Sequence, residues 1–191
     1  LLRNPVIVSL DGLSKEEAIL TIRELGTKVW GYMIGSLAFK WGAGFITEIT
    51  KNISLNLFID LQLVGTPRRI REVISGFSQV GVRFISVNAA SGAPGIRAAV
   101  ESAPLSKILV SSILSSLRLP DVKLLYETTD RGGKALDFAR MAKECGAAGV
   151  CFSSGELELL SHQPGFLIHE LPKDFVIAVF AIRSEGEDPG D

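Results

Sequence analysis

Short apolar segments recur along the chain, and segments with helix-like mixtures of polar and apolar residues lie between them. Seven of these apolar segments lack the strict alternation of a strand with one wet face, so they indicate strands buried on both faces of a parallel sheet. The predicted strands cover residues 6–10, 29–34, 55–60, 83–87, 108–111, 149–152 and 175–180. The interval between strands is about one βα unit, and it is longer only before the sixth. The pattern predicts a single α/β domain over residues 1–191, most economically a (β/α)8 TIM-type barrel.

Helix signals lie between the predicted strands. Ser14 and Glu17 have the spacing of a capping box, in which the two side chains bond the backbone N–H groups at a helix start. They predict a helix over residues 15–25. Two further helices are predicted, one capped by Thr66 and one over residues 137–145. Alternation of helices with strands is what a barrel of parallel strands requires.

A barrel of this type needs an eighth strand, which the sequence does not show. That strand is expected about one βα unit after residue 180, yet residues 181–191 are rich in glycine and acidic side chains and indicate a loop. Either the closing βα unit is absent from the sequence, or the barrel is open and its first strand is exposed to edge-to-edge pairing. We favour the absent last unit.

Composition bounds the class of protein more than its chemistry. The chain has 191 residues, of which 47% are hydrophobic, and a net charge of −1 at pH 7, which suits one domain with a sizeable core. No block of Lys and Arg points to nucleic acid or to a membrane surface. The apolar runs are too short to span a bilayer, and the N-terminus lacks the pattern of a secretory signal. We therefore expect a cytoplasmic protein with neither nucleic acid nor membrane as partner.

The cysteines and histidines do not form a metal-binding pattern. Cys145 and Cys151 lack the Cys-x-x-Cys spacing and are expected to be reduced, buried thiols. His162 and His169 are the two histidines, and a metal site would need more ligands than these. We expect no metal and no other cofactor.

Residues 58–67 carry the most specific chemical pattern in the chain. They resemble the Asp-x-Lys-x-x-Asp-Ile-Pro signature of the orotidine 5'-phosphate decarboxylase family, which lies at the carboxyl end of the third strand of a (β/α)8 barrel. Asp60 occupies the first position, but Gln62 stands where the signature has lysine and Gly65 where it has the second aspartate. The resemblance implies a carboxy-lyase family of pyrimidine biosynthesis, in which Asp60 and Gln62 hold the catalytic positions in degenerate form.

Motifs similar to those of the first, second and fourth strands of this family follow in the expected order. Asp11 ends a segment similar to the first-strand motif, whose aspartate binds the ribose hydroxyls, and Met33 stands at the second-strand lysine. Asn88 matches a fourth-strand position where histidine is common. The resemblance thus places Asp11 and Met33 in the substrate-binding site.

Two further segments complete the resemblance. Ser115 and Ser116 stand for a Thr-Ser pair after the fifth strand, which contacts the pyrimidine, and Arg183 matches the arginine of the seventh-strand phosphate loop. These matches imply a small phosphorylated ligand, either a nucleotide or a sugar phosphate. The two-fold interface of the family implies a homodimer in which the loop of residues 63–69 takes part.

The substitutions bear on the chemistry of the family. Its decarboxylation builds carbanion charge, which is met by an alternating Lys-Asp-Lys-Asp array. Here the array becomes Met33, Asp60, Gln62 and, from the partner subunit, Gly65. An amide cannot donate a proton as an ammonium does, and loss of a single preorganised donor costs about 10² to 10³ in rate. The sequence therefore predicts a family member that keeps a nucleotide or phosphosugar pocket but lacks efficient decarboxylase activity.

Two other functions fit the resemblance. The chain could be an active sugar-phosphate lyase, similar to the hexulose phosphate synthases and keto-gulonate phosphate decarboxylases, although these use the same charged array with magnesium. It could instead be a non-catalytic dimerisation or regulatory partner of a competent paralogue. Arg68, Arg69 and Arg71, at the start of the predicted third helix, form either a solvated face or a site for an anion or carboxylate.

The site residues also have plain structural interpretations. Asp60 could be a satisfied structural carboxylate, and Met33 and Gln62 could fill space. Ser115 and Ser116 could cap the loop in which they lie.

Overall fold

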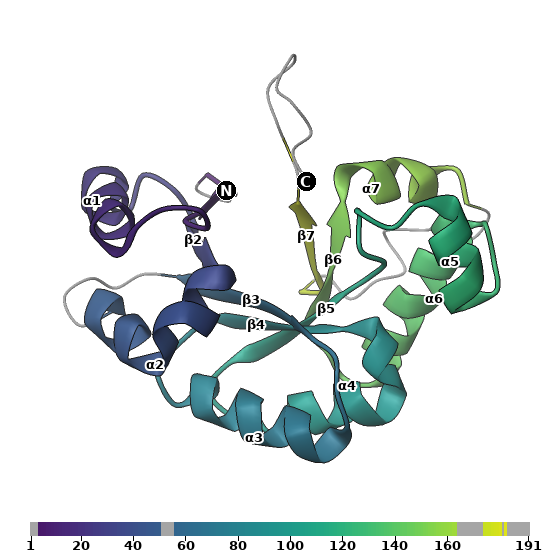
Figure 1. Ribbon diagram of the computed structural model, residues 1–191, viewed down its shortest axis with the longest axis horizontal. Coiled ribbons are helices and arrows are strands. Elements are labelled where there is room, and N and C mark those ends of the chain that lie inside the picture. The colour runs from purple at the N-terminus through teal and green to yellow at the C-terminus, as the bar shows by residue number, and fades with distance from the viewer. Residues whose placement is uncertain (1–3, 51–55, 164–173, 181, 183–191) are drawn as a thin grey trace.

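The computed structural model describes residues 4–50, 56–163, 174–180 and 182. Within them, parallel strands form one seven-stranded sheet in the order β1-β2-β3-β4-β5-β6-β7. The strands are β1 (Ile7–Ser9), β2 (Gly31–Ile34), β3 (Leu57–Leu63), β4 (Phe84–Asn88), β5 (Lys107–Ser111), β6 (Gly149–Ser153) and β7 (Val176–Phe180). The sheet curls, and the helices follow its outer side (Figure 1). This is the arrangement of a TIM-type (β/α) barrel, as the strand spacing predicts.

Helices alternate with the strands around the outside of this curl. They are α1 (Lys15–Leu25), α2 (Ser36–Thr50), α3 (Pro67–Ser78), α4 (Gly92–Glu101), α5 (Leu119–Tyr126), α6 (Arg131–Glu144) and α7 (Ser154–Ser161), and a short 3-10 helix, η1 (Ala89–Ser91), precedes α4. Capping explains several of the starts. Ser14 and Glu17 form the predicted capping box of α1, and Thr66 caps α3 ahead of Pro67.

Two element boundaries differ from the prediction by three residues or more, and each of these differences has a local cause. Strand β3 continues three residues past Asp60 because Leu61 and Leu63 extend the outward-facing apolar row. Helix α6 begins at Arg131, not at residue 137, because the side chain of Asp130 accepts a hydrogen bond from the backbone N–H of Gly133. The first turn of α6 contains glycines and lacks apolar residues, so a prediction based on apolar periodicity misses this helix start.

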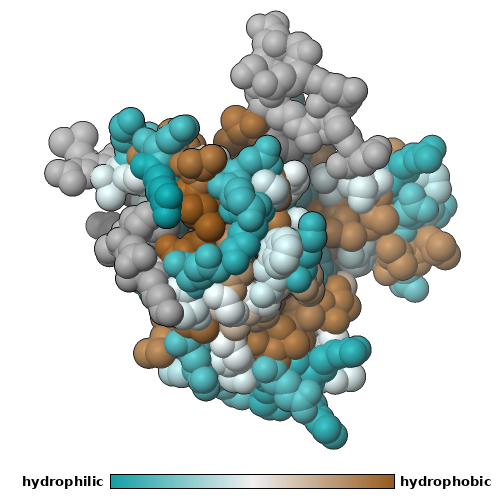
Figure 2. All heavy atoms as spheres, turned by 60° about the vertical axis from the view of Figure 1, so that its left-hand side comes forward, coloured by the Kyte–Doolittle hydropathy of each residue, from teal (hydrophilic) through white to brown (hydrophobic). Residues whose placement is uncertain are grey.

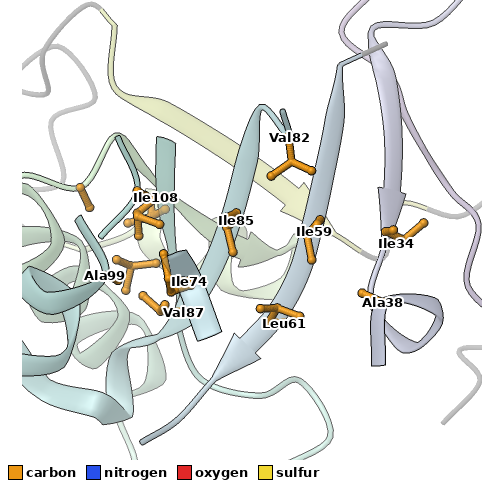
Figure 3. Packing of buried hydrophobic residues seen from close by; sticks show 14 of the residues in the cluster. Ile34, Ala38, Ile59, Leu61, Ile74, Val82, Ile85, Val87, Ala99 and Ile108 are labelled. Atoms are coloured by element: carbon orange, nitrogen blue, oxygen red, sulfur yellow. The ribbon is translucent and has the colours of Figure 1, made fainter. Parts of the chain in front are cut away.

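The main apolar layer lies between the sheet and the helices. Outward-facing strand residues such as Ile59, Ile85 and Ile108 pack there against helical residues such as Ile74 and Ala99 (Figure 3). These side chains are almost completely buried. The alternate residues of the same strands point to the inside of the curl, so the strands are covered on both faces and appear in the sequence as continuous apolar runs.

The inside of the curl is apolar toward the amino ends of the strands. Phe58, Phe84, Leu109, Cys151 and Ala178 form a second buried cluster there. Its aromatic members stack, with 5.4 Å between the ring centroids of Trp30 and Phe84 and 5.9 Å between those of Phe58 and Phe180. This second apolar cluster fills the interior toward the amino ends of the strands. The polar interior residues therefore lie toward the carboxyl ends.

Strands β1 and β7 are the two edges of the sheet in the part of the chain that the structure describes. Strand β1 pairs only with β2, and β7 pairs only with β6. The position expected for an eighth strand lies beyond residue 191, and residues 183–191 are outside the described part. No described helix is both long and apolar enough to cross a membrane.

Apolar side chains also reach the surface on the outer helices. Leu20 on α1 and Phe39 and Trp41 on α2 are substantially exposed. Figure 2 views the molecule from the side of these helices and shows apolar groups among hydrophilic ones. Scattered exposure of this kind is ordinary for a folded surface.

Candidate functional site at the carboxyl ends of the strands

Polar side chains occupy the inside of the curl where β3, β4 and β5 end. Asp60 and Gln62 lie at alternate positions of β3, and Ser86 and Asn88 lie at alternate positions of β4. Ser111 of β5 lies in register with Asn88. Because side chains alternate along a strand, these residues share the face that carries Phe58, Phe84 and Leu109 lower down.

The Asp60 carboxylate is held by uncharged donors. Its Oδ1 accepts a hydrogen bond of 2.6 Å from the Ser86 hydroxyl, and its Oδ2 accepts one of 3.0 Å from the Gln62 side-chain amide. The Ser86 hydroxyl oxygen in turn accepts a bond of 2.9 Å from the Gln62 backbone N–H. Three residues on two neighbouring strands therefore form one closed network.

The electrostatics around Asp60 are those of a buried acid without a cationic partner. Burial raises the pKa of the Asp60 carboxyl, the hydrogen bonds from Ser86 and Gln62 act in the opposite direction, and the charge of Asp11 raises the pKa further. Among the described residues, Asp60 takes part in no ion pair. Within this described part, hydrogen bonds from Ser86 and Gln62 stabilise its charge.

The backbone of β3 is irregular at the same place. Gln62 has a φ of 43°, in the left-handed region that non-glycine residues seldom adopt. The register between β3 and β4 shifts between Ile59 and Leu63, which is the effect of a bulge. This conformation lets the Gln62 backbone N–H and its side-chain amide both reach the Ser86–Asp60 pair, and such strain is typical of functional sites.

Asp11 lies after β1 and bonds the start of α2. Its carboxylate accepts hydrogen bonds from the Gly35 N–H (3.0 Å), the Ser36 hydroxyl (2.9 Å) and the Leu37 N–H (3.4 Å). Helix α2 therefore has a carboxylate from another element at its N-terminus, where the helix dipole favours negative charge. The residue is exposed, and most of its acceptor positions face the protein.

Met33 and Asn88 also lie where the sequence motifs place them, on the interior face. Met33 is partly buried against the interior apolar cluster, in register with Phe58. The Asn88 side chain accepts from the Ala90 N–H (2.9 Å) and donates to the Ser112 carbonyl (3.0 Å). Asn88 thus caps η1 and ties β4 to the end of β5.

Ser115 and Ser116 are apart from the Asp60 network. Both are exposed, in the turn between β5 and α5. The Arg131 guanidinium holds this turn by donating to the carbonyls of Leu117 (2.6 Å) and Leu114 (3.1 Å). The remaining site residue, Arg183, lies outside the described residues.

Interior residues to which the sequence motifs give no role lie at the ends of the neighbouring strands β5 and β6. Ser111 and Ser112 are buried, and neither hydroxyl makes a hydrogen bond of ordinary length within the described part of the chain. Burial raises the pKa of the neighbouring Cys151 thiol, and so does the charge of Asp60, while Ser111 acts in the opposite direction. A thiol is a weak partner for a hydroxyl.

Ser86 is the site residue whose role the sequence motifs leave out. Its signal in the sequence is its position, two residues before Asn88 on a strand, which puts both side chains on the same face. The same alternation assigns Ser111 to the interior through Leu109.

The arginines at the start of α3 are largely engaged with nearby acids. Arg68 pairs with Glu72 at 3.1 Å, and Arg71 pairs with Glu101 of α4 at 3.5 Å. The Arg69 side chain lies against Gly65, whose added Cβ would come 3.5 Å from its Cδ. These contacts agree with a solvated face, since both ion pairs are exposed.

Fold and site together define a (β/α)-barrel protein with an acidic, hydrogen-bonded centre at the carboxyl ends of its strands. Comparison with curated proteins identifies relatives by name. The chain is 28% identical over 197 residues to the orotidine 5'-phosphate decarboxylase of Syntrophus aciditrophicus, covering 97% of this chain and 75% of the relative. It is 27% identical over 194 residues to the enzyme of the same name from Nautilia profundicola, covering 96% and 79%.

Solved structures agree with these relatives. The orotidine 5'-phosphate decarboxylase of Lactobacillus acidophilus superimposes with a TM-score of 0.71 at 26% identity, covering 91% of this chain and 79% of that one. An uncharacterized conserved protein from Geobacillus kaustophilus shares the fold, with a TM-score of 0.74 at 22% identity and coverage of 93% and 83%. No family model matches the sequence. By these likenesses the chain is similar to orotidine 5'-phosphate decarboxylases over nearly its whole length.

Proposed function

We propose that this protein binds a phosphorylated ligand, a nucleotide or a sugar phosphate, at the carboxyl ends of its strands and does not decarboxylate orotidine 5'-phosphate efficiently. The observation that carries the proposal is the environment of Asp60, whose carboxylate is bonded by the Ser86 hydroxyl and the Gln62 amide. Similarity to orotidine 5'-phosphate decarboxylases supports the ligand class, and the neutral network supports the loss of activity.

The chemical argument concerns the proton. Decarboxylation leaves a carbanion that must be protonated, and a preorganised cation lowers the barrier by meeting that charge. At position 62, where the family signature has lysine, this chain has an amide that already donates to Asp60. At position 33 it has a thioether packed against apolar side chains. Neither group can supply a proton, and losses within a unit that acts together do not add in a simple way.

A decarboxylation assay with carbon dioxide release as the readout tests the loss of activity. We expect the unmodified chain to show no rate above background with orotidine 5'-phosphate. The triple variant Met33→Lys, Gln62→Lys, Gly65→Asp should recover measurable turnover if the ligand site is otherwise intact. Robust turnover by the unmodified chain would overturn the proposal.

A thermal-shift panel tests the ligand class in the same preparation. Uridine, orotidine and xanthosine monophosphates and several sugar phosphates are compared with the corresponding unphosphorylated compounds. A ligand that binds only the folded state raises the melting temperature, so we expect at least one phosphorylated compound to do so. A panel without any shift would contradict a retained ligand site.

We also propose that the chain is a homodimer that uses the loop between β3 and α3. Val64 in this loop is an apolar side chain with 57% exposure, and the loop adjoins the Asp60 network through Gln62. Sedimentation velocity at micromolar concentration should give a dimer. A monomer for both the unmodified chain and the Val64→Ser variant would contradict the proposed interface.

A further inference from the structure

The charge that acts on Asp60 within the described part of the chain is negative. Asp60 is itself negative when ionised, and the charge that raises its pKa comes from Asp11. The side chains bonded to Asp60 are a hydroxyl and an amide, from Ser86 and Gln62. A second anionic group brought to this position would meet repulsion without a compensating cation.

The same site offers an uncharged hydrogen-bonding group that the fold uses only in part. The Gln62 amide donates to Asp60, and its oxygen accepts no bond from the described chain. A ligand group with its own donor would satisfy this oxygen, and an acceptor on the same group would take the second N–H of the amide.

We propose that the group of the ligand that faces Asp60 is uncharged and bears both a hydrogen-bond donor and an acceptor, and that the site selects against a carboxylate at this position. This inference rests on the proposed function, because it specifies the ligand of that same site. It assigns Gln62 and Asp60 a role in specificity. An amide or imide group of the ligand would meet both requirements of the Gln62 amide.

The size of the effect follows from the charge. Two like charges a few ångströms apart in a partly buried site repel strongly enough to weaken binding by about tenfold or more. The preference for the ligand without the carboxylate should shrink when Asp60 is made neutral, and it should reverse when a cation replaces Gln62. A purely steric preference would not respond to either change of charge.

Titration calorimetry with matched ligand pairs tests the inference. Uridine 5'-phosphate and orotidine 5'-phosphate differ only in the ring carboxylate, and ribose 5-phosphate and 5-phosphoribonate differ mainly in one carboxylate. The phosphate is constant within each pair, so the ratio of affinities reports the group that faces Asp60. For the unmodified chain we expect the member without the carboxylate to bind about tenfold tighter or more.

Three variants sharpen the measurement. Asp60→Asn should narrow the ratio, and Gln62→Lys should invert it. The matched control Asp137→Asn, at an exposed position on α6, should leave the ratio unchanged, and its melting curve checks that a carboxylate-to-amide change does not perturb folding. An affinity ratio that is the same in the unmodified chain, Asp60→Asn and Gln62→Lys would overturn the role of these two residues in specificity.

The outcomes separate this inference from the proposed function. Binding of either pair with equal affinity, or with preference for the carboxylate, would overturn the inference and leave a retained ligand site standing. Failure of all four compounds to bind would overturn the proposed function and the inference with it. Tighter binding of the member without the carboxylate, with a smaller preference in Asp60→Asn, would support both.

Discussion

Asp11 and Asp60 are two carboxylates at the carboxyl edge of one sheet, separated by Gly35. A Cβ at Gly35 would lie 2.7 Å from the Asp11 Oδ2 and 2.9 Å from the Asp60 carbonyl oxygen. Asp11 is exposed and bonded mainly by backbone N–H groups at the start of α2. Asp60 is partly buried and bonded by two side chains.

The two carboxylates therefore differ in how directly they serve the fold. The partners of Asp11 are the donors of a helix start, which a nearby carboxylate satisfies. The partners of Asp60 are side chains of two neighbouring strands. With these partners, the pKa of the Asp60 carboxyl is still raised, and Gln62 still has a strained backbone conformation. Strain and a perturbed pKa are the marks of a site whose arrangement serves something besides stability.

The largest effect is expected at the residue between the two carboxylates. Gly35→Ala places a methyl group against the Asp60 backbone oxygen, which cannot rotate away, so the strands must shift. We expect the free energy of unfolding to fall by about 3 kcal/mol in urea titrations. Gly44→Ala on α2 is the control, because its Cβ would meet nothing within 4 Å; that change should be neutral or stabilising. Similar stability of the two variants would contradict a steric role for the close approach at Gly35.

Removing the first carboxylate should have a somewhat smaller effect. Asp11→Ala leaves the N–H groups of Gly35 and Leu37 and the Ser36 hydroxyl without their acceptor. We expect a loss of about 2 kcal/mol in the free energy of unfolding, and weaker amide protection at the start of α2 by hydrogen exchange. Asp11→Asn keeps one oxygen and should recover part of the loss. If ligand affinity falls in Asp11→Ala while stability does not, Asp11 is a ligand group and not a helix cap.

The comparison also marks how far the sequence reaches. The strands, the α1 capping box and the family follow from patterns that span the chain, because apolar periodicity and cap spacing are local properties. The partners of Asp60 do not follow in this way. Ser86 is remote in sequence and lies beside Asp60 only through the register of β3 and β4, and the bulge at Gln62 shifts that register. Similarly, Asp11 bonds α2 through a packing geometry that no motif encodes.

Ser86 offers a test confined to the second carboxylate. Ser86→Ala removes the 2.6 Å donor to Asp60 and the acceptor of the Gln62 N–H together. We expect a loss of about 1 to 2 kcal/mol in the free energy of unfolding, because a partly buried carboxylate loses a donor and an N–H loses its acceptor. Ser86→Thr retains the hydroxyl and should lose less. Equal losses in the two variants would mean that packing, not the hydrogen bonds, sets the value of this residue.

The smallest and most specific effect is expected from the charge of Asp60. Burial raises the pKa of this carboxyl in the folded state, so the folded protein holds the proton more tightly than the unfolded chain does. The stabilising contribution of the protonated form is therefore complete below the unfolded pKa of about 4 and is lost as the pH rises through the raised folded value. Asp60→Asn does not titrate at this position.

The stability difference between Asp60→Asn and the unmodified chain should therefore shift in favour of the variant as the pH rises across that window and level off above it. Urea titrations of both proteins at several pH values between about 3.5 and 7.5 measure this difference directly, and other titrating groups cancel because both chains contain them. A difference that stays constant with pH would mean that Asp60 ionises as easily in the folded protein as in the unfolded chain. The hydrogen bonds from Ser86 and Gln62 would then compensate fully for the effect of burial on the pKa of Asp60. The electrostatic difference between Asp60 and Asp11 would no longer hold.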